Sequence, residues 1–202
     1  SAGPFINPVE MGLPNHEPIL KVIAADAEYQ KMFESAFGKK GKDITMEHVK
    51  QAIATFERTI VSGDSPFDRY YFGGDQSAMS EAAVRGFEVF LQQGRCVSCH
   101  TISQTHALFT DSDFHNLGVG FGRIDKDVHE MASAYSKAKK TGNELDVEVL
   151  SNKNTSELGR FAVNTQWRDI GAFKTPTLRN IAKTAPYMHD GRCYSLEEIW
   201  TE

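Results

Sequence analysis

Cys96-Val97-Ser98-Cys99-His100 is the stretch that decides the architecture of this 202-residue chain. Thiols at this spacing can each add to a vinyl group of a haem, and the adjacent histidine can reach the iron on the same face. The motif therefore predicts one covalently bound c-type haem, attached through Cys96 and Cys99, with His100 as the proximal iron ligand. The third cysteine, Cys193, receives no role.

Two other kinds of site use a Cys-x-x-Cys pair, a zinc site and a redox-active disulfide. A zinc ion would need a second pair of Cys or His ligands at metal spacing, and Cys193 stands alone. A thioredoxin-like pair would lie at the start of a helix, whereas the pattern upstream predicts a helix that ends before Gly94. Haem attachment is the better interpretation.

Charge and hydropathy exclude several kinds of partner. The chain has 22 basic and 27 acidic residues and a formal net charge of -5, which supplies no basic field for nucleic acid. No apolar run approaches the roughly 18 residues that a spanning helix requires, so we expect no membrane span. Because haem c is generally attached outside the bacterial inner membrane, we expect a periplasmic protein.

Apolar periodicity predicts a mainly α-helical chain. One helix is expected over residues 17–37, ending at Gly38. Thr45 is expected to cap a second helix that stops at Gly63, and Ser80 a third. The remaining predicted segments are an irregular loop over residues 101–124, a polar helix over 125–140, a surface excursion over 141–157 and a capping box over 195–198.

The sixth ligand decides what a haem iron can do. A strong ligand such as methionine makes an electron carrier, whereas a vacant position permits peroxide or oxygen chemistry. Met188 and His189 are candidates, although a methionine beside Tyr187 also suits a core. His106 and His115 lie near the motif in sequence and are equally suited to hold a propionate or a carbonyl. Spacing alone leaves this ligand open.

Several stretches, taken in order, resemble the bacterial di-haem cytochrome c peroxidase and MauG family. They cover nearly the whole chain: GPFINPVEM (3–11), AIATFERT (52–59), SPFDR (65–69), the haem motif, GRFAV (159–163), FKTPTLRN (173–180) and TAPYMHDG (184–191). Members of this family look like two c-type haem domains, one that shuttles electrons and one that meets peroxide.

The resemblance implies a domain layout for this chain. Residues 1–16 would be an interdomain linker that carries the distal-pocket motif of a second haem. Residues 17–202 would be a C-terminal haem domain, mainly α-helical and c-type cytochrome-like, wrapped around its covalently bound haem with long loops. The first haem would lie upstream of Ser1, and the residue that closes the second iron would follow Glu202.

The resemblance also implies roles for residues outside the haem motif. Glu10 would move a proton between the oxygens of bound peroxide, which is general acid–base work, and Pro4 would limit access to that iron. Arg179 would lie near haem propionates, which a guanidinium can bind bidentately. Backbone carbonyls of Thr184 and Pro186 would help to hold calcium between the haems. Without the flanking motifs, Glu10 would be read as a surface carboxylate and Arg179 as part of a surface ion pair.

The implied activity is a haem-dependent peroxidase that reduces hydrogen peroxide with electrons relayed through the His100 haem. The donor would be a small c-type cytochrome or a cupredoxin; in the MauG branch an oxidisable protein substrate replaces it. The long segment 122–157 favours MauG-like relatives, whereas Gly94 stands where MauG has a relay tryptophan. A mono-haem electron carrier without catalytic iron is the alternative, and homodimer formation stays open.

Overall fold

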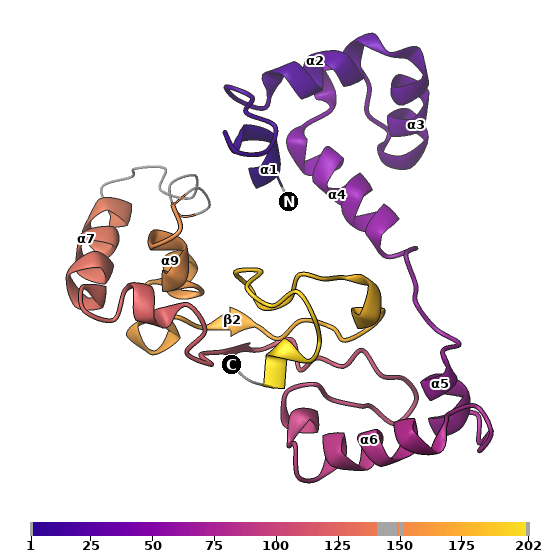
Figure 1. Cartoon of the computed structure of the whole chain (residues 1–202). Helices are drawn as coiled ribbons and strands as arrows, with labels where there is room; N and C mark the ends of the chain where they lie inside the picture. Colours follow the sequence, from indigo (N-terminus) through magenta and orange to yellow (C-terminus); the bar gives the residue numbers. More distant parts are fainter. Residues whose placement is uncertain (1, 141–148, 150–151, 201–202) are drawn as a thin grey trace. The chain divides into compact units, whose positions relative to one another are not determined.

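The chain folds into two compact units. The computed structural model describes residues 2–140, 149 and 152–200 (Figure 1). The first unit comprises Ser1–Val61 and Tyr135–Ser156, and the second comprises Ser62–Ala134 and Glu157–Glu202. Helices and short 3-10 turns make up most of the regular structure, which confirms the prediction of a mainly α-helical chain with long loops.

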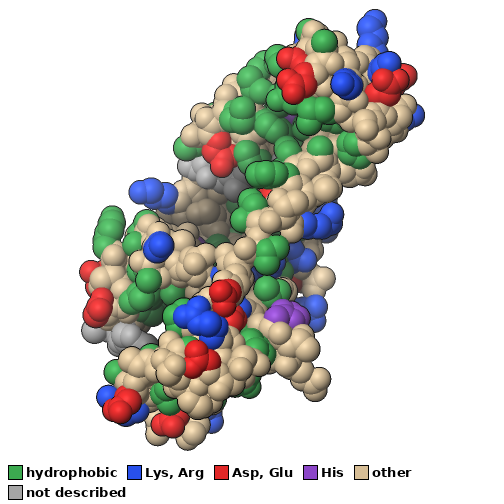
Figure 2. All heavy atoms as spheres, turned by 90° about the vertical axis from the view of Figure 1, so that its right-hand side faces the viewer, with side chains coloured by type: hydrophobic (Ala, Val, Ile, Leu, Met, Phe, Trp, Pro, Cys, Tyr) green, Lys and Arg blue, Asp and Glu red, His purple; other side chains and the backbone are tan. Residues whose placement is uncertain are grey.

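The regular structure of the first unit is helical in the part that the structure describes. Its elements are α1 (Gly3–Ile6), α2 (Glu17–Ala25), α3 (Ala27–Phe37), the 3-10 turn η1 (Gly41–Asp43) and α4 (Met46–Glu57), and the end of α7 (Val128–Lys140) also belongs to this unit. Ile23, Phe33, Ile44 and Val49 are buried together and form its core. In the space-filling view, hydrophobic side chains gather over this unit among scattered charged ones (Figure 2).

The single helix predicted over residues 17–37 is wrong, because the chain breaks at Asp26. This residue has an extended backbone, and its carboxylate accepts hydrogen bonds from the N–H groups of Glu28 and Tyr29 at 2.8 and 2.9 Å. An aspartate in this position satisfies N–H groups that the start of a helix leaves unpaired. The apolar positions on either side keep the same period, so periodicity alone did not reveal the break.

The predicted start of the second helix is confirmed, but its predicted end is not. Thr45 and His48 form a capping box at the start of α4. The helix ends at Glu57, before Gly63, and Ile60 and Val61 beyond it are exposed. These two side chains therefore do not extend the apolar face of α4.

The second unit carries short elements separated by long loops. They are α5 (Pro66–Tyr71), α6 (Glu81–Leu91), η2 (Cys96–Ser98), β1 (Phe114–His115), η3 (Phe121–Arg123), α9 (Phe161–Asn164), η5 (Trp167–Asp169), β2 (Phe173–Lys174), η6 (Ile181–Lys183) and η7 (Glu198–Trp200), while η4 (Thr155–Leu158) lies across the unit boundary. The strands are antiparallel, with Phe114 opposite Lys174 and His115 opposite Phe173.

The remaining helix predictions are met in part. Ser80 caps α6 as predicted, since its hydroxyl accepts a hydrogen bond from the N–H of Ala83 at 3.2 Å. The polar helix α7 (Val128–Lys140) begins slightly later than predicted. Most of residues 141–157 lie outside the described residues. No helix of the described residues is both long and apolar enough to span a membrane.

Aromatic rings pack α5 against α6 and against the loop that follows the Cys96–His100 motif. The ring of Phe67 on α5 lies 5.3 Å from that of Phe87 on α6 and 4.9 Å from that of Phe109, centroid to centroid. Phe90, also on α6, lies 6.1 Å from Phe109. These rings meet edge to face, a favourable arrangement for aromatic side chains. The cluster holds Phe109 beside the end of α6, where the motif begins.

Candidate haem-attachment site

The Cys96–His100 motif follows directly on the end of α6. The N–H of Gly94 donates to the carbonyl of Val89 at 2.8 Å, and the motif then folds as the turn η2. A Cβ at position 94 would lie 3.0 Å from the Val89 oxygen and 3.1 Å from the sulfur of Cys96. A glycine therefore suits this close approach, and a bulky side chain here would require its neighbours to move.

His100 is oriented as a metal ligand should be. Its Nδ1 lies 2.8 Å from the backbone carbonyl oxygen of Phe109. A carbonyl oxygen only accepts, so Nδ1 carries the proton and donates it. In neutral imidazole this tautomer leaves the lone pair on Nε2, and a hydrogen bond at the far nitrogen fixes the ring and raises its basicity. The ring is thus prepared to bind iron through Nε2.

Both thiols of the motif are unpaired and half-buried. The sulfur of Cys96 lies 3.4 Å from the carbonyl oxygen of Gly94, and that of Cys99 lies 3.8 Å from the hydroxyl of Ser98. The His100 N–H donates to the carbonyl of Cys96 at 2.9 Å, so one turn joins all three groups. This donor set fits covalent attachment of a haem.

In the described part of the chain, one group of side chains offers Cys99 an alternative role as a metal ligand. Ligand atoms of Cys99, Asp111 and His115 lie within 4.8 Å of one another, a set that could hold a metal ion. Backbone and His115 hydrogen bonds lower the pKa of Asp111 to about 2. An ion here would use Cys99 and leave Cys96 unexplained, whereas a haem accounts for both cysteines and for the orientation of His100.

Comparison with known proteins points to the same cofactor. The family model for di-haem cytochrome c peroxidase matches residues 1–77. The methylamine utilization protein MauG of Methylorubrum extorquens is 34% identical over 97% of this chain and 45% of its own length. Cytochrome c551 peroxidase of Nitrosomonas europaea is 32% identical over 98% of this chain and 48% of its own.

The chain is similar to the di-haem cytochrome c peroxidase and MauG family over nearly its whole length. Among solved structures, a MauG-like protein associated with microbial copper homeostasis matches with a TM-score of 0.63 and 28% identity, over 97% of this chain and 53% of that chain. The chain spans about half the length of these relatives. This similarity implies haem c as the cofactor.

Arg179, which the family resemblance predicts near haem propionates, pairs with Asp68 in this structure. The two groups form a bidentate pair with N to O distances of 2.6 and 2.7 Å, and Nε of Arg179 donates to the carbonyl of Ala107 at 2.8 Å. The hydrogen bonds from Arg179 hold the pKa of the Asp68 carboxyl well below its usual range. The propionate contact stays a prediction.

Thr184 and Pro186, the predicted calcium ligands of the family, lie in an exposed turn after η6. Beyond it, Tyr187 and Cys193 pair as an antiparallel bridge, and the Tyr187 N–H donates to the Cys193 carbonyl at 2.6 Å. Cys193, unexplained by the sequence, is buried at this bridge. The structure thus gives Cys193 a packing position, while the calcium ligands stay predictions.

Pro4 and Glu10, the predicted distal-pocket residues of the family, lie in the first unit. Pro4 is in α1, and its carbonyl accepts a hydrogen bond from the N–H of Met11 at 3.3 Å. The N–H of Glu10 donates to the carbonyl of the buried Asn7 at 3.1 Å, and the Glu10 side chain is exposed. One compact turn therefore holds both residues, and their catalytic roles stay predictions.

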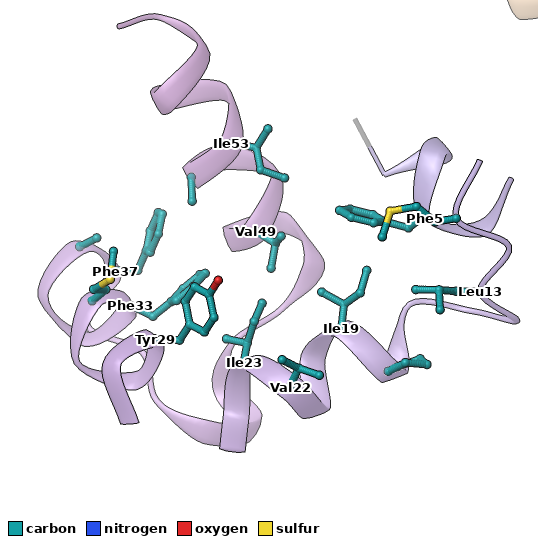
Figure 3. A pocket seen from close by; sticks show the side chains of 15 residues that line it. Phe5, Leu13, Ile19, Val22, Ile23, Tyr29, Phe33, Phe37, Val49 and Ile53 are labelled. Atoms are coloured by element: carbon teal, nitrogen blue, oxygen red, sulfur yellow. The ribbon is translucent and has the colours of Figure 1, made fainter. Parts of the chain in front are cut away.

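A cavity of about 620 Å³ lies in the same unit. Apolar side chains from α1 to α4 point into it, and Figure 3 labels ten of the residues that line it: Phe5, Leu13, Ile19, Val22, Ile23, Tyr29, Phe33, Phe37, Val49 and Ile53. Met11, the neighbour of Glu10, also lines this space. Sequence reasoning placed the lining residues from position 17 onward in helices and left Phe5, Met11 and Leu13 in the predicted linker, but it did not assemble them into a cavity.

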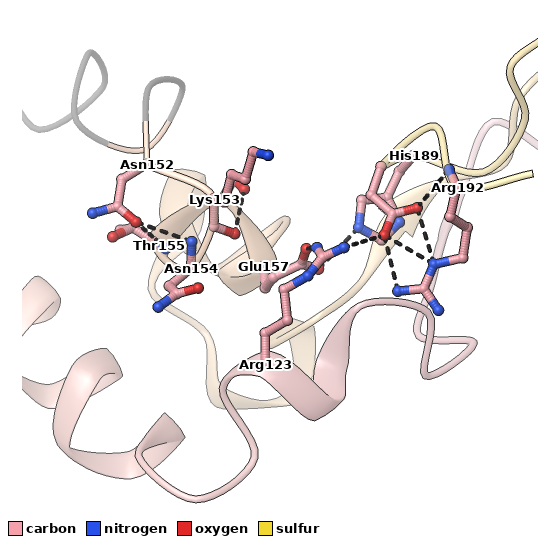
Figure 4. A network of polar contacts seen from close by, with 10 residues as sticks. Arg123, Asn152, Lys153, Asn154, Thr155, Glu157, His189 and Arg192 are labelled. Carbon is pink, nitrogen blue, oxygen red and sulfur yellow. Dashed lines mark hydrogen bonds and ion pairs between the residues drawn. The ribbon is translucent and has the colours of Figure 1, made fainter.

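Sequence reasoning missed a buried ionic network in the second unit (Figure 4). The side chain of Glu157 is 2% exposed, contacts Arg123 and lies 2.9 Å from Nε2 of His189. Arg123 also reaches Asp190 at 2.5 Å. The His189 ring stacks on Phe173, and its Nε2 contacts the Glu157 carboxylate. Polar residues precede Glu157 in the sequence, so the surface excursion predicted over residues 141–157 wrongly included this buried side chain.

Proposed function

We propose that this chain is the electron-transfer haem portion of a periplasmic di-haem peroxidase of the cytochrome c peroxidase and MauG type. The observation that carries the proposal is the hydrogen bond from His100 to the Phe109 carbonyl beside the two free thiols. When bound, the haem supplies one-electron redox chemistry. Cys96 and Cys99 would anchor it, and Nε2 of His100 would bind its iron.

The predicted linker, residues 1–16, would serve the peroxide-binding haem, which the rest of the natural protein would contribute. An apolar cavity suits the face of a haem, and Pro4 and Glu10 lie in the unit that contains it. Reduction of hydrogen peroxide to two waters consumes two electrons and two protons. Glu10 would carry a proton between the peroxide oxygens, and a small c-type cytochrome or cupredoxin would supply the electrons.

Haem attachment is tested first, by intact mass and by the pyridine haemochrome spectrum of the chain produced in cells that mature c-type cytochromes. One covalent haem is expected. The double variant Cys96→Ala, Cys99→Ala should lose it, whereas Cys193→Ala, which changes the cysteine outside the motif, should keep it. A parent chain that matures without haem would overturn the proposal.

Peroxidase activity is tested in the natural protein that contains this chain, by the oxidation of a reduced small c-type cytochrome after peroxide is added. Glu10→Gln should lower the turnover number by about a hundredfold or more, the range expected for loss of a general acid–base. Glu17→Gln is the matched control, because Glu17 is an exposed carboxylate of the same unit that pairs with Lys21. Equal turnover in both variants would remove Glu10 from the mechanism.

Calcium binding would rest on the carbonyls of Thr184 and Pro186. Treatment of the natural protein with a chelator should then lower its activity, and added calcium should restore it. Unchanged activity at a calcium content below one ion per molecule would contradict this part of the proposal.

Oxidation of a protein substrate is the second candidate function. It is favoured by the 34% identity to MauG and by the match to the MauG-like structure. The same peroxide assay separates the two functions. Rapid oxidation of the small cytochrome supports the peroxidase, whereas negligible cytochrome oxidation together with peroxide-dependent oxidation of a co-purifying protein supports the MauG-type function.

A further inference from the structure

Four consecutive backbone carbonyls after the haem motif each accept a hydrogen bond from a side chain. We name residues 107–110 the proximal loop. The four bonds run from Arg179 Nε to Ala107 (2.8 Å), Thr177 Oγ1 to Leu108 (2.6 Å), His100 Nδ1 to Phe109 (2.8 Å) and Thr101 Oγ1 to Thr110 (2.8 Å). The carbonyl that orients His100 is therefore flanked on both sides by carbonyls that are themselves held.

Phe109 adopts a backbone conformation that needs such support. Its φ is 53°, in the left-handed region that a bulky residue rarely occupies. Strained backbone conformations of this kind persist only where surrounding contacts hold them in place, and they cluster at functional sites. The Phe109 ring packs against those of Phe67 and Phe90, and the Arg179 guanidinium lies 5.4 Å from its centroid.

The support is itself anchored to α5. Asp68, which accepts hydrogen bonds from Nη1 and Nη2 of Arg179, also accepts from the N–H and the hydroxyl of Ser65 at 2.9 Å. The side chains of Arg179 and Asp68 are only 14% and 16% exposed. A continuous set of polar contacts thus runs from the start of α5 through Arg179 to the proximal loop.

From these contacts we infer that Thr177, Arg179 and Asp68 are positioning residues for His100, and that they set the reduction potential of its haem. The inference rests on the proposed haem attachment at His100. A well-aligned bond from Nδ1 to the Phe109 carbonyl makes the imidazole a stronger donor to iron, which favours the oxidised metal. Loosening the proximal loop should therefore raise the potential.

Thr177→Val tests the inference in the haem-loaded protein, because it removes the hydroxyl with little change of shape. The readout is a spectroelectrochemical titration of the His100 haem. We expect about a two- to tenfold rise in the ratio of reduced to oxidised haem at a fixed potential, the range that corresponds to one net hydrogen bond. Thr177→Ser keeps the hydroxyl and should restore the parent value.

Thr55→Val is the matched control. The Thr55 hydroxyl donates to the carbonyl of Gln51 at 2.8 Å on α4, in the other unit. This variant loses the same kind of hydroxyl-to-carbonyl bond, although the Thr177 hydroxyl also accepts from the Arg179 N–H at 3.1 Å, and it should leave the potential unchanged. A second variant, Asp68→Asn, releases Arg179 by another route and should shift the potential in the same direction as Thr177→Val.

Each outcome is decisive. A parent potential in both Thr177→Val and Asp68→Asn, with haem still attached, would overturn the inference and leave the proposed function intact. An equal shift in Thr55→Val would also overturn it, because the effect would then be nonspecific. If Thr177→Val failed to mature, Asp68→Asn alone would decide. A parent chain without covalent haem would instead refute the proposed function.

Discussion

Replacement of Glu157 by glutamine should destabilise the second unit strongly, because this carboxylate is buried between two partners. One oxygen accepts from Arg123 and the other lies 2.9 Å from His189. Glutamine keeps the shape of the side chain but presents an NH₂ group to one of these partners, where an acceptor is required. The variant thus removes one charge-assisted hydrogen bond without creating a cavity.

The expected loss of stability in Glu157→Gln follows from how deeply each partner of Glu157 is buried. A hydrogen bond to a charged group contributes about 1.5–3 kcal/mol, and breaking a fully buried ion pair costs about 3–5 kcal/mol. The Arg123 side chain is 37% exposed and keeps its contact with Asp190, so the lower range applies. We expect Glu157→Gln to cost about 2–3 kcal/mol, which corresponds to about 4–12 °C in Tm.

Urea unfolding of the haem-loaded chain, followed by haem absorbance, reports on the unit that contains Glu157. Glu81→Gln is the control, because the Glu81 side chain is 98% exposed and its pair with Arg85 is long, at 3.9 Å. It should cost less than about 1 kcal/mol, including its position in the first turn of α6. A loss in Glu157→Gln no larger than in this control would refute the reasoning.

Further predictions concern a close approach, a helix cap and an acid-labile carboxylate. Gly120→Ala should lower the free energy of unfolding in urea by about 2–4 kcal/mol, because position 120 has a positive φ and the new Cβ would overlap the Glu157 carboxylate. Gly118→Ala is the control: position 118 also has a positive φ but open space around it, so the loss should be only about 1–2 kcal/mol. Asp26→Ala should lower thermal stability by about 1 kcal/mol through loss of the α3 cap, whereas Asp26→Asn should be nearly neutral by calorimetry. Burial raises the pKa of Asp190, but hydrogen bonds from two arginines outweigh it and lower the pKa to about 2. Because the pKa of Asp190 is lower in the folded than in the unfolded chain, its carboxylate stabilises the fold above the unfolded pKa of about 3.9, and this stabilisation is lost as the pH falls towards 2. Asp190→Asn should therefore flatten the dependence of the free energy of unfolding on pH between about pH 4 and pH 2. An unchanged profile in that variant would contradict the assignment.

Short-range features of the fold could be predicted from the sequence. The caps at Thr45 and Ser80 were found because a capping side chain bonds to N–H groups within the next few residues. Asp26 is equally local but was missed, because the apolar period continues across it and suggests one long helix. The late start of α7 at Val128 is a boundary shift of the ordinary kind.

Long-range contacts were beyond the sequence. Arg179 and Asp68 are 111 residues apart, and Glu157 and His189 are 32 apart. No periodicity or spacing pairs such residues, because the chain can close loops of these lengths in many ways at similar entropic cost. The propionate contact predicted for Arg179 came from family resemblance, whereas the pairing with Asp68 came from the folded structure.

The sequence by itself predicted the attachment chemistry, because two thiols and an imidazole within five residues lie close together whatever the rest of the chain does. The tertiary structure decided how that imidazole is held. It brought the Phe109 carbonyl to Nδ1 of His100, buried Glu157 beside Arg123 and gathered the apolar side chains of four helices around one cavity. These arrangements depend on packing between segments distant in sequence, so only the folded chain specifies them.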